Sequence, residues 1–235
     1  MATGSPTRSS IPRVDIISIG TLSRNLLWNE TQPARTPHAT TTLIRAGRRH
    51  ILVDPGLPAQ ILAARLFERT GLKAEQIDTV FLTNFRPAHR AGLSLFAHAK
   101  LLISENEQAW TRSQLERLIE QAPDEDIDRR TLEAELRVLD TLRPADDKLA
   151  EAVDLFPLPG YTPGTCGLLI SSPLTTTLLT GDAVPTLDHF LAGQLLPDAH
   201  DLETAGESLR EVYEIADLIV PGHDNWFRNP RMQGI

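Results

Sequence analysis

Five short segments of the chain carry histidine, aspartate, arginine and tyrosine residues that could do chemistry. In chain order they are Val53-Asp54-Pro55-Gly56, Thr83-Asn84-Phe85-Arg86-Pro87-Ala88-His89-Arg90-Ala91-Gly92, Pro159-Gly160-Tyr161-Thr162-Pro163-Gly164, Thr180-Gly181-Asp182 and Val220-Pro221-Gly222-His223-Asp224. Imidazole and carboxylate groups bind divalent metal ions, which can activate water for hydrolysis. The second segment follows residues 79–83, an apolar run typical of a buried strand, and open α/β sheets place their ligands where strands end. Histidine and aspartate residues placed after predicted strands favour a metal site.

Together and in this order, the five segments resemble the motifs of the metallo-β-lactamase fold superfamily. The family pattern reads Val-Asp-x-Gly, Thr-His-x-His-x-Asp-His-x-Gly, Pro-Gly-His-Thr-Pro-Gly, Gly-Asp and a late Pro-Gly-His. The chain keeps that order over roughly residues 40 to 225. The resemblance implies an α/β fold, called α+β in some schemes, built as a four-layer αββα sandwich.

The resemblance also implies that one of the two family metals has lost its ligands. Asn84, Arg86 and Tyr161 stand where the family has three histidines. Arg86 keeps its positive charge at ordinary pH and would repel a cation. These three residues are therefore expected to bind the substrate, with Arg86 and Tyr161 contacting a carboxylate, a phosphate or a carbonyl oxygen. In the other interpretation, Arg86 pairs with Asp54 or Asp182 and balances carboxylates left without a cation.

The second family metal keeps three of its four ligands. The resemblance assigns it to His89, Asp182 and His223, while Ala88 replaces the fourth ligand. Two imidazoles and a carboxylate suit one divalent metal, with zinc expected first and iron(II), manganese or nickel as alternatives. Asp182 could also orient the metal-bound water or accept its proton, and Asp54 is expected beside a ligand. In the alternative interpretation, no metal binds and the three residues form a hydrogen-bonded polar cluster.

Two classes of function follow. The first is metal-dependent hydrolysis of a small ester, thioester, lactone or phosphoester. The second is a non-catalytic member of the fold that binds a small anionic ligand through Arg86, or a protein partner through an insertion of about residues 105–140. The fold by itself does not choose between substrates.

The remaining histidines give weaker signals. His38, His189 and His200 lie where a replacement ligand could stand, although an isolated loop histidine is more often a surface residue. His50 and His98 are interpreted as structural. Asp188 and Asp224 are candidate local charge partners.

Composition excludes several other functions. The 235 residues, 41% of them hydrophobic, suffice for one domain, expected over residues 13–235 after a flexible arm of residues 1–12. A net charge of -8 argues against nucleic acid and anionic lipid as partners. No apolar run is long enough for a membrane span and the N-terminus lacks the core of a secretory signal, so a cytoplasmic location is expected. Cys166 is the only cysteine, which rules out an intrachain disulfide.

Hydrophobic periodicity predicts the elements that carry these segments. Residues 46–49 should form a hairpin turn, and Ser104 with Glu107 should form a capping box that opens a helix running through Leu118. A second amphipathic stretch near Leu132 to Leu139 completes the helical insertion, which is expected to shape the substrate site or to form a homodimer. The predicted strands are residues 14–19, 41–45, 50–53, 79–83, 101–103, 153–158, 166–171, 177–180 and 218–220, and further helices are predicted at residues 58–70 and 201–216.

Overall fold

The computed structural model describes residues 11–123 and 127–231. Residues 1–10 of the predicted N-terminal arm lie outside the described part of the chain. The same holds for residues 124–126, which belong to an acidic run between the two insertion helices.

The first sheet is built by the first half of the chain. It contains six strands, β1 to β6 in spatial order, with β1, β2 and β3 antiparallel and β3 to β6 parallel. Every residue of β4 is buried, as expected for a strand covered on both faces. The strands are β1 Arg13–Ser18, β2 Thr41–Ala46, β3 Arg49–Val53, β4 Thr79–Leu82, β5 Lys100–Ile103 and β6 Arg143–Pro144.

The second sheet is built by the second half. Its six strands follow the order β12-β11-β10-β9-β8-β7, and all neighbours are antiparallel except the parallel pair β10 and β11. Because β10 and β11 run in the same direction, their carboxyl ends lie at one edge of the sheet. The strands are β7 Lys148–Ala150, β8 Val153–Pro157, β9 Cys166–Ser172, β10 Thr175–Gly181, β11 Leu218–Pro221 and β12 Phe227–Arg228.

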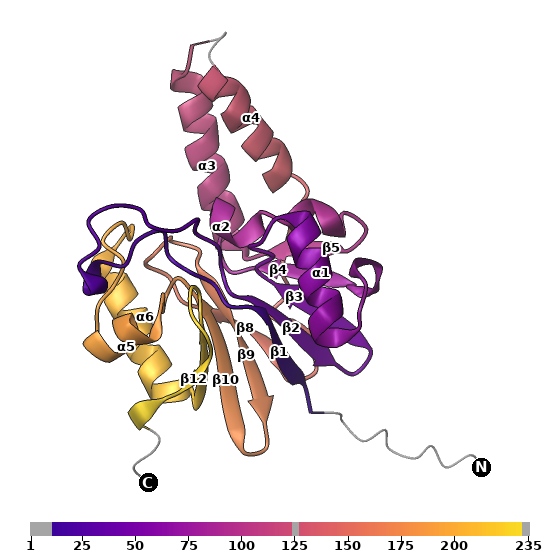
Figure 1. The fold of residues 1–235 in the computed structure, drawn as a ribbon. Helices are drawn as coiled ribbons and strands as arrows, with labels where there is room; N and C mark the ends of the chain where they lie inside the picture. Colours follow the sequence, from indigo (N-terminus) through magenta and orange to yellow (C-terminus); the bar gives the residue numbers. More distant parts are fainter. Residues whose placement is uncertain (1–10, 124–126, 232–235) are drawn as a thin grey trace.

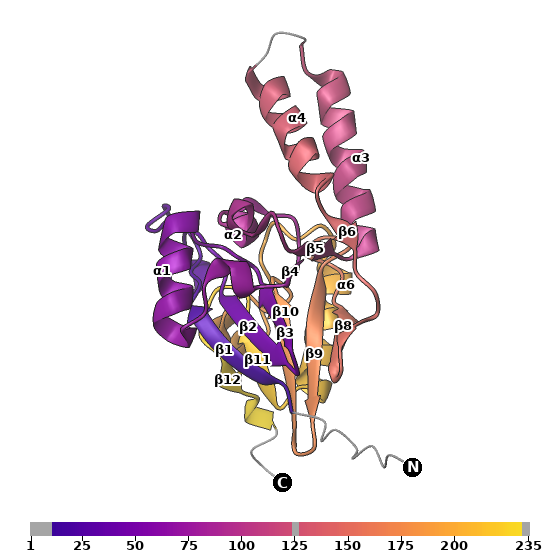
Figure 2. The same ribbon diagram turned by 90° about the vertical axis from the view of Figure 1, so that its right-hand side faces the viewer.

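Helices cover the outer face of each sheet, α1 on the first sheet and α5 and α6 on the second (Figures 1 and 2). Among the described residues, no helix combines the length and apolar character needed to cross a membrane. The α-helices are α1 Ala59–Thr70, α2 Pro87–Arg90, α3 Glu105–Gln121, α4 Ile127–Leu139, α5 Leu187–Ala192 and α6 Leu202–Ile215, and the 3-10 helices are η1 Leu26–Trp28, η2 Ala74–Gln76 and η3 Leu93–Phe96.

Three hydrophobic clusters hold the layers together. The middle cluster lies between the sheets, where Phe81 of β4 packs in one core with Leu179 of β10 and Val220 of β11. The outer clusters pack helices on sheets, with Leu62 of α1 in the first and Val212 of α6 in the second. This succession of helix, sheet, sheet and helix confirms the expected αββα sandwich.

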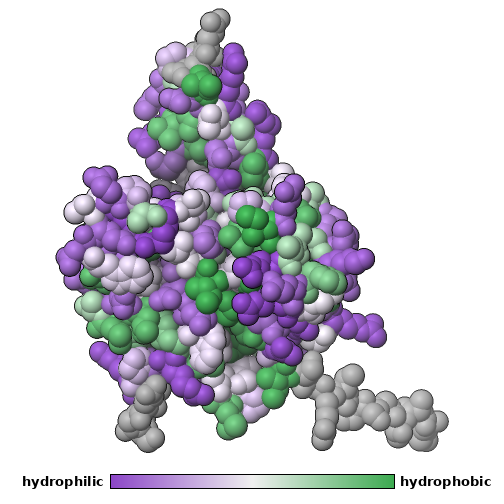
Figure 3. Space-filling model, viewed as in Figure 1, coloured by the Kyte–Doolittle hydropathy of each residue, from purple (hydrophilic) through white to green (hydrophobic). Residues whose placement is uncertain are grey.

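The α3–α4 hairpin projects from the sandwich (Figures 1 and 2). Ser104 caps α3 by accepting a hydrogen bond from the backbone N–H of Glu107, as predicted. The other half of the predicted capping box is wrong, because the Glu107 carboxylate bonds to Phe85 and Thr162 and not to the backbone N–H of Ser104. The surface of the α3–α4 hairpin shows hydrophobic side chains among hydrophilic ones (Figure 3). Leu118 and Ile127 of these two helices are exposed.

The Glu107 carboxylate is instead buried against two loops. Oε1 accepts a hydrogen bond of 3.0 Å from the backbone N–H of Phe85, and Oε2 accepts one from the hydroxyl of Thr162. Burial raises the pKa of Glu107, although the hydrogen bond from Thr162 opposes that shift. Glu107 therefore joins the loop after β4 to the loop between β8 and β9.

Candidate metal centre

Three of the predicted site residues meet at one end of the sandwich. His89 lies in α2, just after β4 of the first sheet, while Asp182 follows β10 and His223 follows β11 of the second sheet. Each residue is therefore placed by the carboxyl end of a buried strand, where a sheet leaves side chains free to converge.

Two glycines allow the loops after β10 and β11 to approach each other closely. Gly181 has a φ of +52°, and a Cβ atom there would lie 2.4 Å from Oγ1 of Thr83. A Cβ atom on Gly222 would lie 2.8 Å from the carbonyl group of Gly181. Only glycine fits both places without strain. The residues that follow them, Asp182 and His223, are thereby brought side by side.

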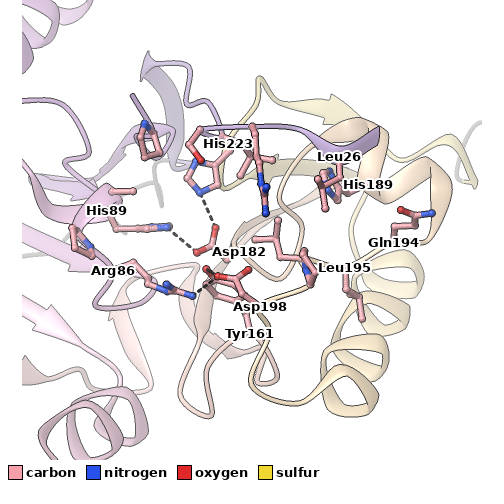
Figure 4. Close-up of a pocket in the computed structure, with 18 residues that line it drawn as sticks. Leu26, Arg86, His89, Tyr161, Asp182, His189, Gln194, Leu195, Asp198 and His223 are labelled. Atoms are coloured by element: carbon pink, nitrogen blue, oxygen red, sulfur yellow. Dashed lines mark hydrogen bonds and ion pairs between the residues drawn. The ribbon is translucent and has the colours of Figure 1, made fainter. Parts of the chain in front are cut away.

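The two histidines point at the Asp182 carboxylate, each toward a different oxygen (Figure 4). Nε2 of His89 lies 3.0 Å from Oδ2 of Asp182, and Nε2 of His223 lies 2.9 Å from Oδ1. The three side chains are buried, and each offers one ligand atom within 4.8 Å of the others. Such a spacing allows all three atoms to contact one ion.

The remaining ring nitrogens face hydrogen-bond acceptors. Nδ1 of His223 lies 3.0 Å from the backbone carbonyl oxygen of His38, which can only accept. Nδ1 of His89 lies 3.0 Å from Oδ2 of Asp54 and 3.2 Å from Oγ1 of Thr83. Both Nδ1 atoms are thus expected to carry protons, which leaves both Nε2 atoms for the centre.

Asp54 and Thr83 form a fixed support behind His89. Asp54 accepts hydrogen bonds from the backbone N–H of Thr83 at 2.9 Å and from its hydroxyl at 2.7 Å. Asp54 itself has a φ of +50°, a left-handed conformation that aspartate and asparagine tolerate better than most residues. The turn after β3 is therefore shaped around this carboxylate, which lies beside a candidate ligand as the sequence predicted.

The charges of the cluster balance without any external ion. Burial disfavours the charged form of His89, but Asp182 and Asp54 outweigh it and raise its pKa to about 10. Burial likewise opposes ionisation of Asp182, yet His89 and His223 hold its pKa well below its usual range. A proton on His89 therefore supplies the positive charge that a metal would otherwise supply.

One oxygen of the cluster lacks a hydrogen bond. Oδ1 of Asp182 lies 2.9 Å from Nε2 of His223, but this oxygen is buried and has no hydrogen-bond partner among the described residues. An unsatisfied buried acceptor is uncommon in folded proteins. The oxygen and the two Nε2 atoms are ligand types that zinc and other divalent metals accept. The residues present thus fit a metal ion.

Arg86 does not pair with Asp54 or Asp182, so that interpretation is wrong. Its guanidinium donates a 2.8 Å hydrogen bond to Asp198 and lies over the ring of Tyr161, 4.7 Å from its centroid (Figure 4). The Tyr161 hydroxyl contacts the same carboxylate at 3.3 Å. The histidines already balance Asp182, and Asp198 is the carboxylate left for Arg86.

Asn84 also differs from its predicted place. It is fully buried and does not line the cavity described below. Its side-chain amide donates a 2.9 Å hydrogen bond to Oδ2 of Asp182 and accepts one of 3.0 Å from the backbone N–H of Arg86. Asn84 therefore positions Asp182 from behind instead of facing a substrate.

A cavity of about 630 Å³ opens onto the cluster, and His89, Asp182, His223, Arg86 and Tyr161 line it. Its volume is that of a small-molecule site. The remaining walls come largely from the chain between β1 and β2 and from the loop after α5.

The other histidines lie around the cluster without joining it. His189 lines the cavity, but its Nδ1 lies 2.8 Å from the hydroxyl of Thr186, and burial lowers its pKa. His38 contributes only its backbone to His223, and the ring of His200 packs edge-on against Trp110. The rings of His50 and His98 contact backbone carbonyl groups, as structural residues do.

The two predicted charge partners have local roles. Asp188 accepts a 2.6 Å hydrogen bond from the indole N–H of Trp28, and Asp224 accepts backbone N–H groups of Leu187 and Asn225. Neither carboxylate reaches the centre.

Sequence reasoning missed Thr83, Glu107 and Asp198. Thr83 opens the second segment, so its place at the end of β4 was a usable signal. Glu107 was interpreted as part of a capping box with Ser104, so its contacts with the two loops were not predicted. Asp198 gave no signal, because its partner Arg86 is 112 residues away in sequence.

Three solved structures share this fold at low sequence identity. A Staphylococcus aureus protein classed as a metal-dependent hydrolase has a TM-score of 0.68 at 12% identity, with 95% of each chain covered. A Thermotoga maritima protein classed as a metallo-β-lactamase has a TM-score of 0.66 at 18% identity, covering 93% of this chain and 100% of the other. AidC, a dizinc quorum-quenching lactonase, has a TM-score of 0.60 at 20% identity, covering 75% of this chain and 67% of AidC.

Family membership comes from the sequence itself. The comparison with curated proteins gives no match. A family model described as the metallo-β-lactamase superfamily matches residues 35–223, a span that holds the first four segments and the fifth as far as His223. Because this span is well over half of the chain and the fold agrees, the chain belongs to the metallo-β-lactamase superfamily.

Proposed function

We propose that the protein is a hydrolase with a single divalent metal held by His89, Asp182 and His223, acting on a small ester or lactone. The observation that carries this proposal is the buried cluster itself. Its three ligand atoms lie within 4.8 Å of one another, and Oδ1 of Asp182 lacks a hydrogen-bond partner. A metal would satisfy that oxygen and replace the proton on His89.

A second metal is not part of the proposal. Asn84, Arg86 and Tyr161 offer an amide, a guanidinium and a phenol where the family pattern has histidines. The Arg86 guanidinium stays charged and disfavours a cation beside it. Burial further raises the pKa of the Tyr161 hydroxyl, which disfavours the phenolate form that a metal would need.

The residues of the chain would act on water and on the substrate. When bound, the metal supplies a Lewis acid and lowers the pKa of water. If Oδ1 of Asp182 binds the metal, the other oxygen, Oδ2, would accept the proton of the attacking water, and Asn84 holds that oxygen in place with a hydrogen bond. Arg86 has N–H donors beyond the one bonded to Asp198, and these polarise the substrate carbonyl oxygen.

The first experiment is elemental analysis of protein purified without a metal-binding tag. We expect about one equivalent of divalent metal in the parent and in a His200→Ala control, and none in a His89→Ala/His223→Ala double variant. Esters, lactones, thioesters and phosphodiesters are then assayed before and after chelation, with metal added back. Parent protein that is folded, free of metal and inactive after zinc, iron(II) or manganese is added would overturn the proposal.

A metal-free ligand-binding role is the second candidate, and one observation favours it. With its pKa raised to about 10, protonated His89 balances the cluster without any metal. In that case the cavity binds a small anion through Arg86, and thermal stabilisation by that anion disappears in Arg86→Ala. Metal content separates the two candidates directly.

A further inference from the structure

One wall of the cavity is a closed loop, residues 21–38, which we call the strap. Its ends are joined by two backbone hydrogen bonds between Thr21 and His38, of 2.9 and 3.1 Å. The strap runs from the first sheet to the side of α5 and α6, where η1 lies (Figure 1). It lines the cavity with Leu22, Ser23, Arg24, Leu26 and Pro37.

The backbone on both sides of Arg24 is held in place. The carbonyl oxygen of Leu22 accepts a 3.1 Å hydrogen bond from Nε of Arg35, and that of Ser23 accepts one of 2.7 Å from the backbone N–H of Ala34. On the other side, Asn25 is buried and caps η1 through Leu27. The base of the Arg24 side chain is thus positioned before any ligand arrives.

The tip of the strap is attached to the second sheet's helices. Trp28 in η1 donates a hydrogen bond to Asp188 of α5, and Arg35 packs over the Trp28 ring while it pairs with Glu30. These contacts use the charge of Arg35 within the strap. They leave Arg24 as the strap's cavity-facing cation.

The Arg24 guanidinium has no carboxylate partner among the described residues. Its one hydrogen bond runs from Nη1 to the carbonyl oxygen of Thr31, at 3.4 Å, near the limit for such a bond. The other arginine of the cavity, Arg86, is paired with Asp198. Arg24 therefore gives the cavity one uncompensated positive charge.

We infer that Arg24 binds a carboxylate on the substrate, so that the substrate of this cavity is an ester or lactone that also carries a carboxylate group. The inference rests on the proposed function for the reaction, but the binding site stands on the strap alone. A guanidinium matches a carboxylate with two parallel hydrogen bonds. In a chain with a net charge of -8, an unpaired arginine in a cavity is the feature that favours an anion there.

The test compares adipate with its dimethyl ester by isothermal titration calorimetry. Adipate offers a carboxylate to Arg24, whereas the dimethyl ester has none. The variants are Arg24→Gln and Arg48→Gln, a matched control in the exposed β2–β3 turn outside the cavity. The parent and the control should bind adipate roughly five- to tenfold more tightly than the ester, and Arg24→Gln should bind the two equally.

Either of two results overturns the inference. One is a parent that shows no preference for adipate, and the other is an Arg24→Gln variant that keeps the preference. Metal content and hydrolysis of mono-4-nitrophenyl adipate and its methyl ester are measured on the same preparations. If the protein hydrolyses these esters equally well with and without Arg24, the inference about Arg24 is contradicted and the proposed reaction stands. If adipate binding depends on Arg24 but the protein holds no metal and hydrolyses neither ester, the proposed reaction is contradicted and the inference stands.

Discussion

Replacing Asp54 by asparagine should weaken metal binding although Asp54 is not itself a candidate ligand. Asparagine has nearly the same shape and tolerates the left-handed backbone at this position, so the turn after β3 should keep its conformation. Only the pattern of donors and acceptors behind His89 changes. The variant therefore tests whether the orientation and tautomer of His89 are set from behind.

The size of the effect follows from the contacts of the carboxylate. One oxygen of Asp54 accepts the Thr83 N–H, and the other accepts the Thr83 hydroxyl and lies 3.0 Å from Nδ1 of His89. In either orientation, the asparagine amide nitrogen meets the Thr83 N–H or the side of the ring that carries its proton. A shift of that proton to Nε2 removes the ligand atom. We expect a loss of about 10- to 100-fold in metal affinity, which is about 1.4 to 2.7 kcal/mol.

The assay is a competition titration of zinc against a chromophoric chelator at fixed pH. Glu107→Gln is the matched control, because Glu107 is a buried carboxylate whose charge acts on His89 without touching its ring. It should change the affinity by less than about threefold. The reasoning is refuted if Asp54→Asn binds zinc as tightly as the parent, or if Glu107→Gln loses as much affinity, since charge alone would then explain the effect.

Three further predictions concern stability. Gly181→Ala should destabilise the fold by at least about 1–2 kcal/mol because Gly181 has a positive φ. Gly206→Ala, in open space on α6, should stabilise it by up to about 1 kcal/mol. Urea unfolding of each variant measures the change in the free energy of unfolding and its sign. Glu107→Ala leaves the Phe85 N–H without its acceptor and should lose about 1–3 kcal/mol, while Glu107→Gln, which keeps an acceptor, should lose less in the same assay. In protein freed of metal by a chelator, the charge of His89 should stabilise the fold, because the pKa of His89 is raised to about 10. This contribution is complete below about pH 6.5 and falls as the pH rises towards about 10. Thermal melts should show that decline in the parent and not in His89→Gln.

The larger elements of the fold were predictable from the sequence because each is a short apolar run between turn residues. The predicted helix at residues 58–70 is α1, and the predicted strand at residues 166–171 is β9, each within one residue at either end. The elements that were missed are short. β6 and β12 have two residues each and α5 has six, so none of them contains enough periods of a pattern to be recognised.

The site was predictable only as far as the family motif reached. The motif brought His89, Asp182 and His223 together, and the structure places them within reach of one ion. It could not assign the partner of Arg86, because Asp198 lies in a distant loop with no motif of its own. It also could not foresee that Glu107 would leave its helix cap, since the competing partner, the buried Phe85 N–H, is created by tertiary packing.

The position of the three candidate ligands has a mechanical consequence for the whole chain. His89 is delivered by the first sheet, and Asp182 and His223 by the second. In the described part of the chain, two backbone hydrogen bonds join the halves near the cluster, from Cys166 to Thr83 at 3.0 Å and from Thr40 to Gly222 at 2.7 Å. An ion bound there would cross-link the two sheets at one end of the sandwich, as a disulfide cross-links a smaller protein. Its removal would let the two sheets part first at the end that holds the cavity.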